Sequence, residues 1–253
     1  MFIVLTNDDG IYASGLRAMY RALLAAGHEV QVIAPLGEQS AVGHSITVAN
    51  PLRSKRVEET DFNGIAVSGT PTDCVKLGLT RLVERQPDLV VSGMNAGANV
   101  GPDILYSGTV AAATEAAAMG VPALAVSHNS FRHPDVDDYA RYAVSLIDEI
   151  PWCRLPPKRV INLNLPACPF SECKGLALCP QTDTAWNDWY DEREDPRGMT
   201  YWWIDGEIPM EHVAEGTDKH MVEQGWATLT PLKFDFTDRD CLALIKEAMP
   251  GAK

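Results

Sequence analysis

The sequence lacks any apolar run that approaches the roughly 20 residues of a membrane-spanning helix, so we expect no membrane partner. Its first residues, Met1 to Leu5, contain no basic leader, and the chain turns polar at Thr6, before a signal-peptide apolar region could form. These two absences predict a cytoplasmic protein.

Basic residues are scarce, because 21 Lys and Arg stand against 34 Asp and Glu and give a formal net charge of −13. With no basic stripe to offset this charge, binding to a nucleic acid polymer is disfavoured. A small anionic substrate remains compatible with the composition if a metal ion or a helix N-terminus supplies local positive potential.

Cysteine is present but is not arranged as a metal site or a disulfide framework. The six Cys residues are irregularly spaced, with no Cys-x-x-Cys pair and no neighbouring His to complete a zinc site. We therefore expect free thiols.

Short apolar runs alternate with segments of helical periodicity over the first 165 residues. Strands joined through helices run parallel, which predicts a doubly wound, mainly parallel α/β sheet of Rossmann-like type, covered on both faces. The predicted strands are 2–6, 29–34, 89–92, 123–127 and 160–165, and the predicted helices lie within 14–27, 70–85, 107–119 and 139–150. Ser14 is the expected N-cap of the first helix.

The periodicity is lost after Pro166, and we expect one domain over residues 1–253, with its core in about 1–179. Residues 180–225 are predicted to form a β-hairpin arm, and residues 226–253 a final strand, at 227–232, and a helix. The arm carries four Trp residues, too much apolar surface to remain in solvent, so it is predicted to pack on another subunit or cover the site.

Asp8 and Asp9 follow the first predicted strand directly. Ligands of doubly wound sheets bind beyond the carboxyl ends of the strands, and paired carboxylates suit Mg²⁺, Mn²⁺ or Ca²⁺ better than zinc or copper. Asp and Gly also favour turns for backbone reasons alone, so 7–10 taken by itself is equally consistent with a simple turn.

Residues 92–101 follow the third of these strands and contain three glycines and two asparagines, Asn95 and Asn99. Glycines allow backbone N–H groups to approach an anion. Asn side chains offer an oxygen to a metal or amide donors to a phosphate. The composition favours a binding loop over a structural one.

Residues 106–110, Tyr-Ser-Gly-Thr-Val, open an Ala-rich helix whose free N–H groups and hydroxyls could hold a phosphate. Capping the helix is the commoner role of such a Ser, and Ser107 can be the N-cap and still lie beside a ligand. Residues 38–45 follow the second strand and add Ser40 and His44. His44 could be a general acid, although a lone loop His rarely is.

Four motifs together resemble the SurE survival-protein family of metal-dependent nucleotidases. They are Asn-Asp-Asp-Gly at 7–10, Gly-Thr-Pro-Thr-Asp-Cys-Val at 69–75, Ser-Gly-Met-Asn-Ala-Gly-x-Asn-x-Gly at 92–101 and Tyr-Ser-Gly-Thr-Val at 106–110. The resemblance covers nearly the whole chain and is weaker in the arm. The loop around Ser40 departs from the commoner Arg-Ser-Gly-x-Ser of the family.

The resemblance implies removal of phosphate from nucleoside 5′-monophosphates, often from 3′-monophosphates, and in some members from short polyphosphate. It implies one divalent ion per subunit, Mg²⁺ or Mn²⁺, with the metal ligands Asp8, Asp9, Ser40 and Asn95. Ser107, Gly108 and Thr109 would hold the phosphate, with Asn95 and Asn99 as further donors. It also implies a homodimer or homotetramer that exchanges its C-terminal segment.

The catalytic residues implied by this assignment are Asp8 and Asp9. Attack by water, with one of these aspartates as base, and attack by an aspartate to form an aspartyl-phosphate both fit the sequence. A haloacid-dehalogenase-like phosphatase would need Asp-x-Asp at this strand end, whereas the pair here is adjacent. A nucleotide sensor without turnover, or a phosphatase of another small phosphoester, is the competing interpretation.

Overall fold

The apolar runs of the sequence form strands of one sheet in the computed structural model, which describes residues 1–132, 135–249 and 251. The strands of this sheet are β1 (Phe2–Thr6), β2 (Glu29–Pro35), β3 (Ser54–Glu59), β4 (Phe62–Val67), β5 (Leu89–Ala96), β6 (Ala123–His128), β7 (Val160–Leu165), β8 (Leu176–Leu178) and β11 (Ala227–Leu232). Their order is β3-β4-β2-β1-β5-β6-β7-β11-β8. In this sheet β3 pairs antiparallel with β4 and β11 with β7, while the other strand pairs among the described residues are parallel, so the predicted mainly parallel sheet is confirmed.

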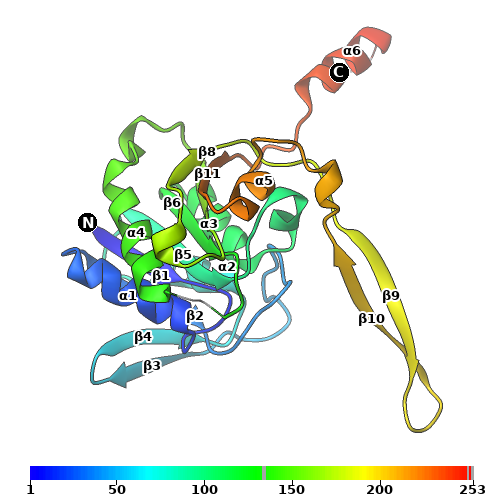
Figure 1. Ribbon diagram of the computed structural model, residues 1–253. Coiled ribbons are helices and arrows are strands. Elements are labelled where there is room, and N and C mark those ends of the chain that lie inside the picture. The colour runs from blue at the N-terminus through cyan, green and yellow to red at the C-terminus, as the bar shows by residue number, and fades with distance from the viewer. Residues whose placement is uncertain (133–134, 250, 252–253) are drawn as a thin grey trace.

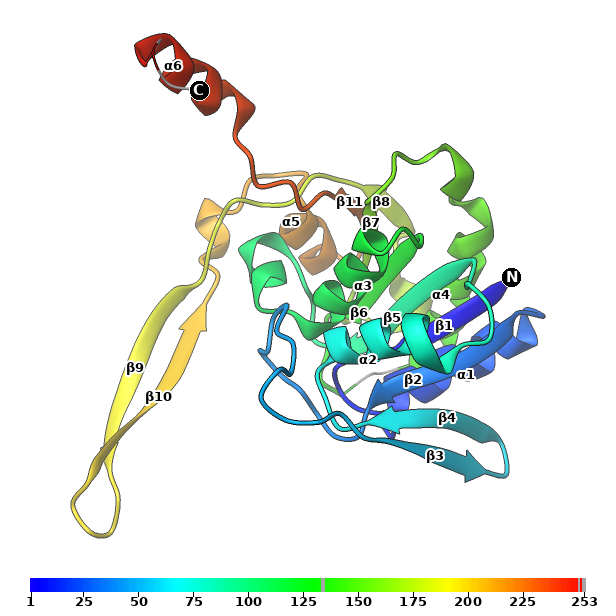
Figure 2. The same ribbon diagram turned by 180° about the vertical axis from the view of Figure 1, so that it is seen from behind.

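Helices cover both faces of the sheet, as Figures 1 and 2 show. On one face lie α1 (Ser14–Ala25) and α4 (Val136–Glu149), and on the other lie α2 (Pro71–Leu77) and α3 (Gly108–Ala118). Ile3 and Leu5 pack into the core beneath the first pair, while Val4 packs into the core beneath the second. The unbroken apolar run of β1 follows from burial on both faces.

The observed helix ends test the predicted caps at Ser107 and Ser14 and the predicted end of the helix over 70–85. Ser107 is the N-cap of α3, as one of its two predicted roles requires, and its Oγ accepts the amide of Val110 at 3.1 Å. Ser14 is not the cap of α1, because the helix already includes it and Ala13 occupies the cap position. The helix predicted to reach residue 85 ends earlier, since α2 continues only through a π-turn, η1 (Gly78–Leu82).

The arm and the C-terminal segment extend away from the sheet in both views (Figures 1 and 2). The arm is an antiparallel hairpin of β9 (Asn187–Glu194) and β10 (Thr200–Glu207). The last helix, α6 (Arg239–Ala248), exposes Leu244 and Ile245. The remaining helices are α5 (Asp218–Glu223) and the short 3-10 turns η2 (Gly101–Leu105), η3 (Trp152–Arg154), η4 (Phe170–Glu172) and η5 (Met210–His212). Across the described residues, no helix combines the length and apolar character needed to traverse a membrane.

Helix α2 begins with a reciprocal cap that ties it to a distant loop. The Asp73 carboxylate accepts the amide of Thr70 at 2.9 Å, and Asp73 N donates to Thr70 Oγ1 at 3.1 Å. Thr47 adds a hydroxyl bond of 2.6 Å and an amide bond of 3.0 Å to the same carboxylate. Burial alone would raise the pKa of Asp73, but these hydrogen bonds together lower it below its usual value.

Replacing Asp73 with Asn is expected to lower the free energy of unfolding by about 1–3 kcal/mol at pH 7, because Thr47 and Thr70 lose a charged acceptor. A lowered carboxyl pKa stabilises the fold above the unfolded-state value and loses that effect as the pH falls through the folded-state value. The difference from the parent should therefore be full above about pH 5 and shrink below about pH 4. Urea unfolding at a series of pH values measures it, and equal stability at pH 7 would contradict this role.

Candidate active site

The carboxyl ends of β1 and β5 meet at one cavity of about 440 Å³. It is lined by six of the residues selected from the sequence, namely Asp8, Asp9, Ser40, Asn95, Asn99 and Ser107. Asn95 was expected just after a strand, but β5 runs on to Ala96 through an irregularity between Ser92 and Asn95. The longer strand still ends at the cavity, so the expected meeting of these side chains is observed.

Asp8 is held by the first turn of α3. Thr109 donates both its amide, at 3.1 Å, and its hydroxyl to the two carboxylate oxygens of Asp8. Only 7% of the Asp8 surface is exposed, and this burial raises the pKa of Asp8 although the bonds from Thr109 oppose the shift. The carboxylate is thus fixed in orientation at the cavity wall.

The position of Thr109 does not suit the predicted role of a phosphate ligand. Thr109 is fully buried, and both of its donors are used by Asp8. Gly108, the residue before Thr109, lies so close to Asp8 that a Cβ added to it would be 2.8 Å from the Asp8 Cβ. With the amides of Thr109 and Val110 engaged, the Gly108 amide is the first-turn donor of α3 left for an anion within the described chain.

Asp9 connects the ends of the two strands. Its Oδ2 accepts the amide of Ala96 at 3.1 Å. Burial, and then the charge of neighbouring Asp8, raise the pKa of Asp9 to about 6. Among the described residues, no Lys or Arg forms an ion pair with either aspartate, so their charge is left without a protein cation.

Polar oxygens surround this pair of carboxylates. Asn95 lines the cavity and donates its side-chain amide to Gly97 O at 2.8 Å, so its side-chain oxygen takes no part in this bond. Ser40 Oγ donates to Glu38 Oε1 at 2.5 Å, and Gln39 N fixes this loop to Asp8 O at 2.8 Å.

This donor set fits a hard divalent cation, since it consists of two carboxylates, an amide oxygen and a hydroxyl. The described residues contain no group of three or more His, Cys, Asp or Glu placed to hold a metal. A cation here would therefore depend on Ser40 and Asn95 in addition to Asp8 and Asp9.

Hydrogen bonds to residues of β7 fix the loop that carries Asn99. Asn164 Oδ1 accepts the amide of Asn99 at 2.7 Å, and Asn162 donates to Asn99 O at 2.8 Å. The Asn99 side chain itself donates to Ser127 Oγ at 2.6 Å. These buried bonds make Asn99 a rigid part of the wall.

His44 does not join this cavity. Its Nε2 lies 2.8 Å from Glu115 Oε2, and the ring lines a separate apolar cavity with Ile104 and Leu232. The Asp8–Asp9 cavity is also lined by residues outside the predicted site set, among them Glu38, Asp103, Tyr106 and Phe131. Phe131 could have been found by the strand-end rule, because it lies three residues after β6.

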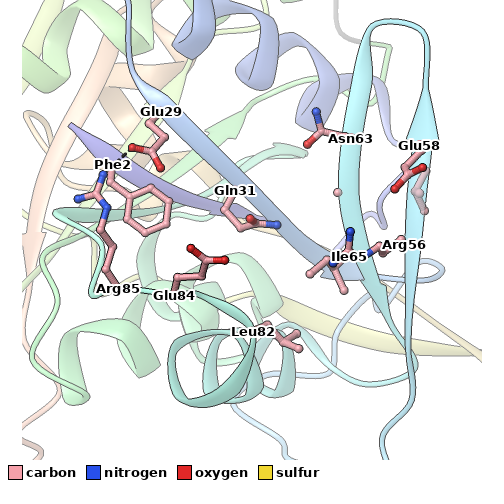
Figure 3. Close-up of a pocket in the computed structure, with 12 residues that line it drawn as sticks. Phe2, Glu29, Gln31, Arg56, Glu58, Asn63, Ile65, Leu82, Glu84 and Arg85 are labelled. Carbon is pink, nitrogen blue, oxygen red and sulfur yellow. Dashed lines mark hydrogen bonds and ion pairs between the residues drawn. The ribbon is translucent and has the colours of Figure 1, made fainter.

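A larger cavity of about 560 Å³ lies elsewhere, against β2, β3 and β4 (Figure 3). Arg85 pairs with Glu29 there at 2.5 Å, and its guanidinium lies 4.5 Å from the centre of the Phe2 ring. None of the residues selected from the motifs lines it. Volume alone therefore does not identify the site.

Comparison with known proteins agrees with the motifs. The family model described as Survival protein SurE matches residues 3–188. The 5′-nucleotidase SurE of Oleidesulfovibrio alaskensis is 64% identical over 249 residues, covering 98% of this chain and 96% of the relative. That of Nitratidesulfovibrio vulgaris (strain Miyazaki F) is 60% identical over 245 residues, covering 97% and 91%. The crystal structure of SurE protein from Aquifex aeolicus matches with a TM-score of 0.83 at 36% identity, covering 98% of this chain and 99% of that one.

Proposed function

The chain belongs to the SurE family, and we propose that its Asp8–Asp9 cavity is where the phosphate of a nucleotide is bound and hydrolysed. The protein is a 5′-nucleotidase, a phosphatase of nucleoside monophosphates. The observation that carries the assignment of the site is the convergence of Asp8, Asp9 and Asn95 at one cavity beside the N-terminus of α3.

We further propose that Asp8, Asp9, Ser40 and Asn95 hold one Mg²⁺ or Mn²⁺ per subunit, a site that Ca²⁺ could also occupy. When bound, the cation supplies positive charge that neutralises phosphate oxygens in a protein of net charge −13. The paired carboxylates, which form no ion pair with a Lys or Arg in the part of the chain that the structure describes, support this assignment.

The chain's own groups would position the phosphate. The N-terminus of α3, with its Gly108 amide, would attract the anion, while Ser107, Asn95 and Asn99 line the cavity beside it. Thr109 acts through Asp8, which it orients. Asp9 accepts the Ala96 amide on Oδ2, so its carboxylate would keep lone pairs both to hold the cation and to accept a proton from the attacking water.

Release of phosphate from a panel of 5′- and 3′-nucleoside monophosphates and short polyphosphate tests these roles. We expect turnover of 5′-nucleotides with Mn²⁺ or Mg²⁺, loss of turnover in EDTA, and recovery when the metal is restored. Recovery is the control for unfolding by the chelator. A folded, metal-bound protein that binds nucleotides without releasing phosphate would instead be a sensor. Turnover that persists in EDTA would contradict the metal assignment.

Assembly by C-terminal exchange is part of the same proposal. Helix α6 carries Leu244 and Ile245 on an exposed surface away from the sheet, and the arm exposes Trp202 and Trp203. These apolar surfaces support burial in a homodimer or homotetramer.

A further inference from the structure

A second cavity of about 410 Å³ adjoins the proposed phosphate site. It shares Asp103 and Phe131 with the first cavity. Its other lining residues come from the loops after β5 and β6, from the base of the arm, and from α5. A substrate anchored by phosphate beside Asp8 could therefore extend into it without leaving the protein surface.

Phe131 forms one aromatic wall of this second cavity. Its side chain is 86% exposed, although it packs on backbone: a Cβ at Gly97 would lie 3.3 Å from its ring. Gly97 has φ +108° and accepts the side-chain amide of Asn95. The ring thus lies against the loop that carries Asn95, while most of its surface stays open.

Trp186 forms another aromatic wall, at the base of the arm. Its Nε1 donates to Asp103 Oδ2 at 2.6 Å, and a Cβ at Gly206 would lie 2.7 Å from its ring. The indole is held between η2 and β10 yet remains 45% exposed. A rigid aromatic side chain that is held and open provides a stacking surface at little entropic cost.

Polar groups complete the cavity. Lys219 Nζ lies 2.7 Å from Glu223 Oε1, and Asn129 donates to the same oxygen at 3.2 Å. Together with Asp103 they offer donors and acceptors of both charges beside the two rings. This combination suits a neutral, planar, hydroxyl-bearing group better than a second phosphate.

We propose that this second cavity binds the nucleoside part of the substrate, with the base against Phe131, Trp186 as the second aromatic wall, and the sugar near Asp103. The proposal rests on the proposed function, because the shared residues connect this cavity to the phosphate site. Stacking on an aromatic ring is tolerant of base identity, since every base has a π-face.

The test compares adenosine 5′-monophosphate with ribose 5-phosphate, which keeps the phosphate and sugar but lacks the base. Phe131→Ala should lower the ratio of the two kcat/KM values about 10-fold or more, mainly through KM for the nucleotide. Phe131→Tyr keeps the ring and should retain the ratio within about 3-fold. Trp202→Ala removes an exposed arm aromatic that does not line the cavity and should leave the ratio unchanged.

Equal losses with both substrates in Phe131→Ala, or no loss with either, would overturn the subsite. If the parent protein hydrolyses no nucleotide, the proposed function fails, and the subsite is then judged by equilibrium dialysis with adenosine. Binding that weakens about 10-fold in Phe131→Ala supports it. Binding that is absent in the parent, or equal in both proteins, rejects it.

Discussion

Asp8→Asn is expected to reduce kcat for a nucleoside 5′-monophosphate by about a thousandfold or more in saturating Mn²⁺. The substitution keeps the side-chain shape and removes the charge nearest the start of α3. An amide also puts an NH₂ group in place of an oxygen that now accepts from Thr109. Both changes weaken the binding of a cation at this position, since the first removes the negative charge and the second disturbs the orientation that Thr109 gives the side chain.

Phosphate release and Mn²⁺ titration, measured together, separate these effects. Asp9→Asn run in parallel should also lose turnover, because it removes the second carboxylate and the proposed base. Asp88→Asn is the matched control: its Oδ2 accepts the amide of Phe2 at 2.7 Å, at the opposite end of β1, and turnover should stay within about twofold. An Asp8→Asn protein that binds metal and keeps near-normal turnover would exclude Asp8 from the catalytic machinery.

The central strands could be predicted because strands that are buried on both faces consist of consecutive apolar residues. β7 and β11 match the expected bounds of 160–165 and 227–232, and β1 matches 2–6. The pair β3 and β4 was not predicted. In β3 only Val57 is buried and the other residues are exposed, so neither alternation nor an apolar run marks the strand.

The site was predictable as far as it follows from strand ends. Asp8, Asp9 and Asn95 meet because neighbouring parallel strands end at the same edge of the sheet. The bond between Thr109 and Asp8 joins residues 101 apart, and no local pattern indicates it. The position of His44 against Glu115 depends likewise on the path of a loop, which local sequence leaves open. The proposed roles of these residues stay predictions.

That long-range bond leads to the second large expected effect. Thr109→Val should lower kcat/KM about 10- to 100-fold while the protein remains folded. Valine matches the shape of threonine but cannot donate to Asp8 Oδ1, so one buried oxygen loses its partner and the carboxylate is oriented less firmly. The Thr109 amide would still hold Oδ2, which is why the loss should be smaller than in Asp8→Asn.

Thr109→Ser is the control that isolates the hydroxyl, because it restores the donor and removes only a methyl group. We expect it to recover most of the activity and Mn²⁺ affinity that Thr109→Val loses. If valine and serine variants lose activity equally, packing rather than the hydrogen bond accounts for the effect. If valine alone is impaired, and metal affinity falls with kcat/KM, then Thr109 acts by orienting Asp8, and a buried residue outside the cavity controls the chemistry within it.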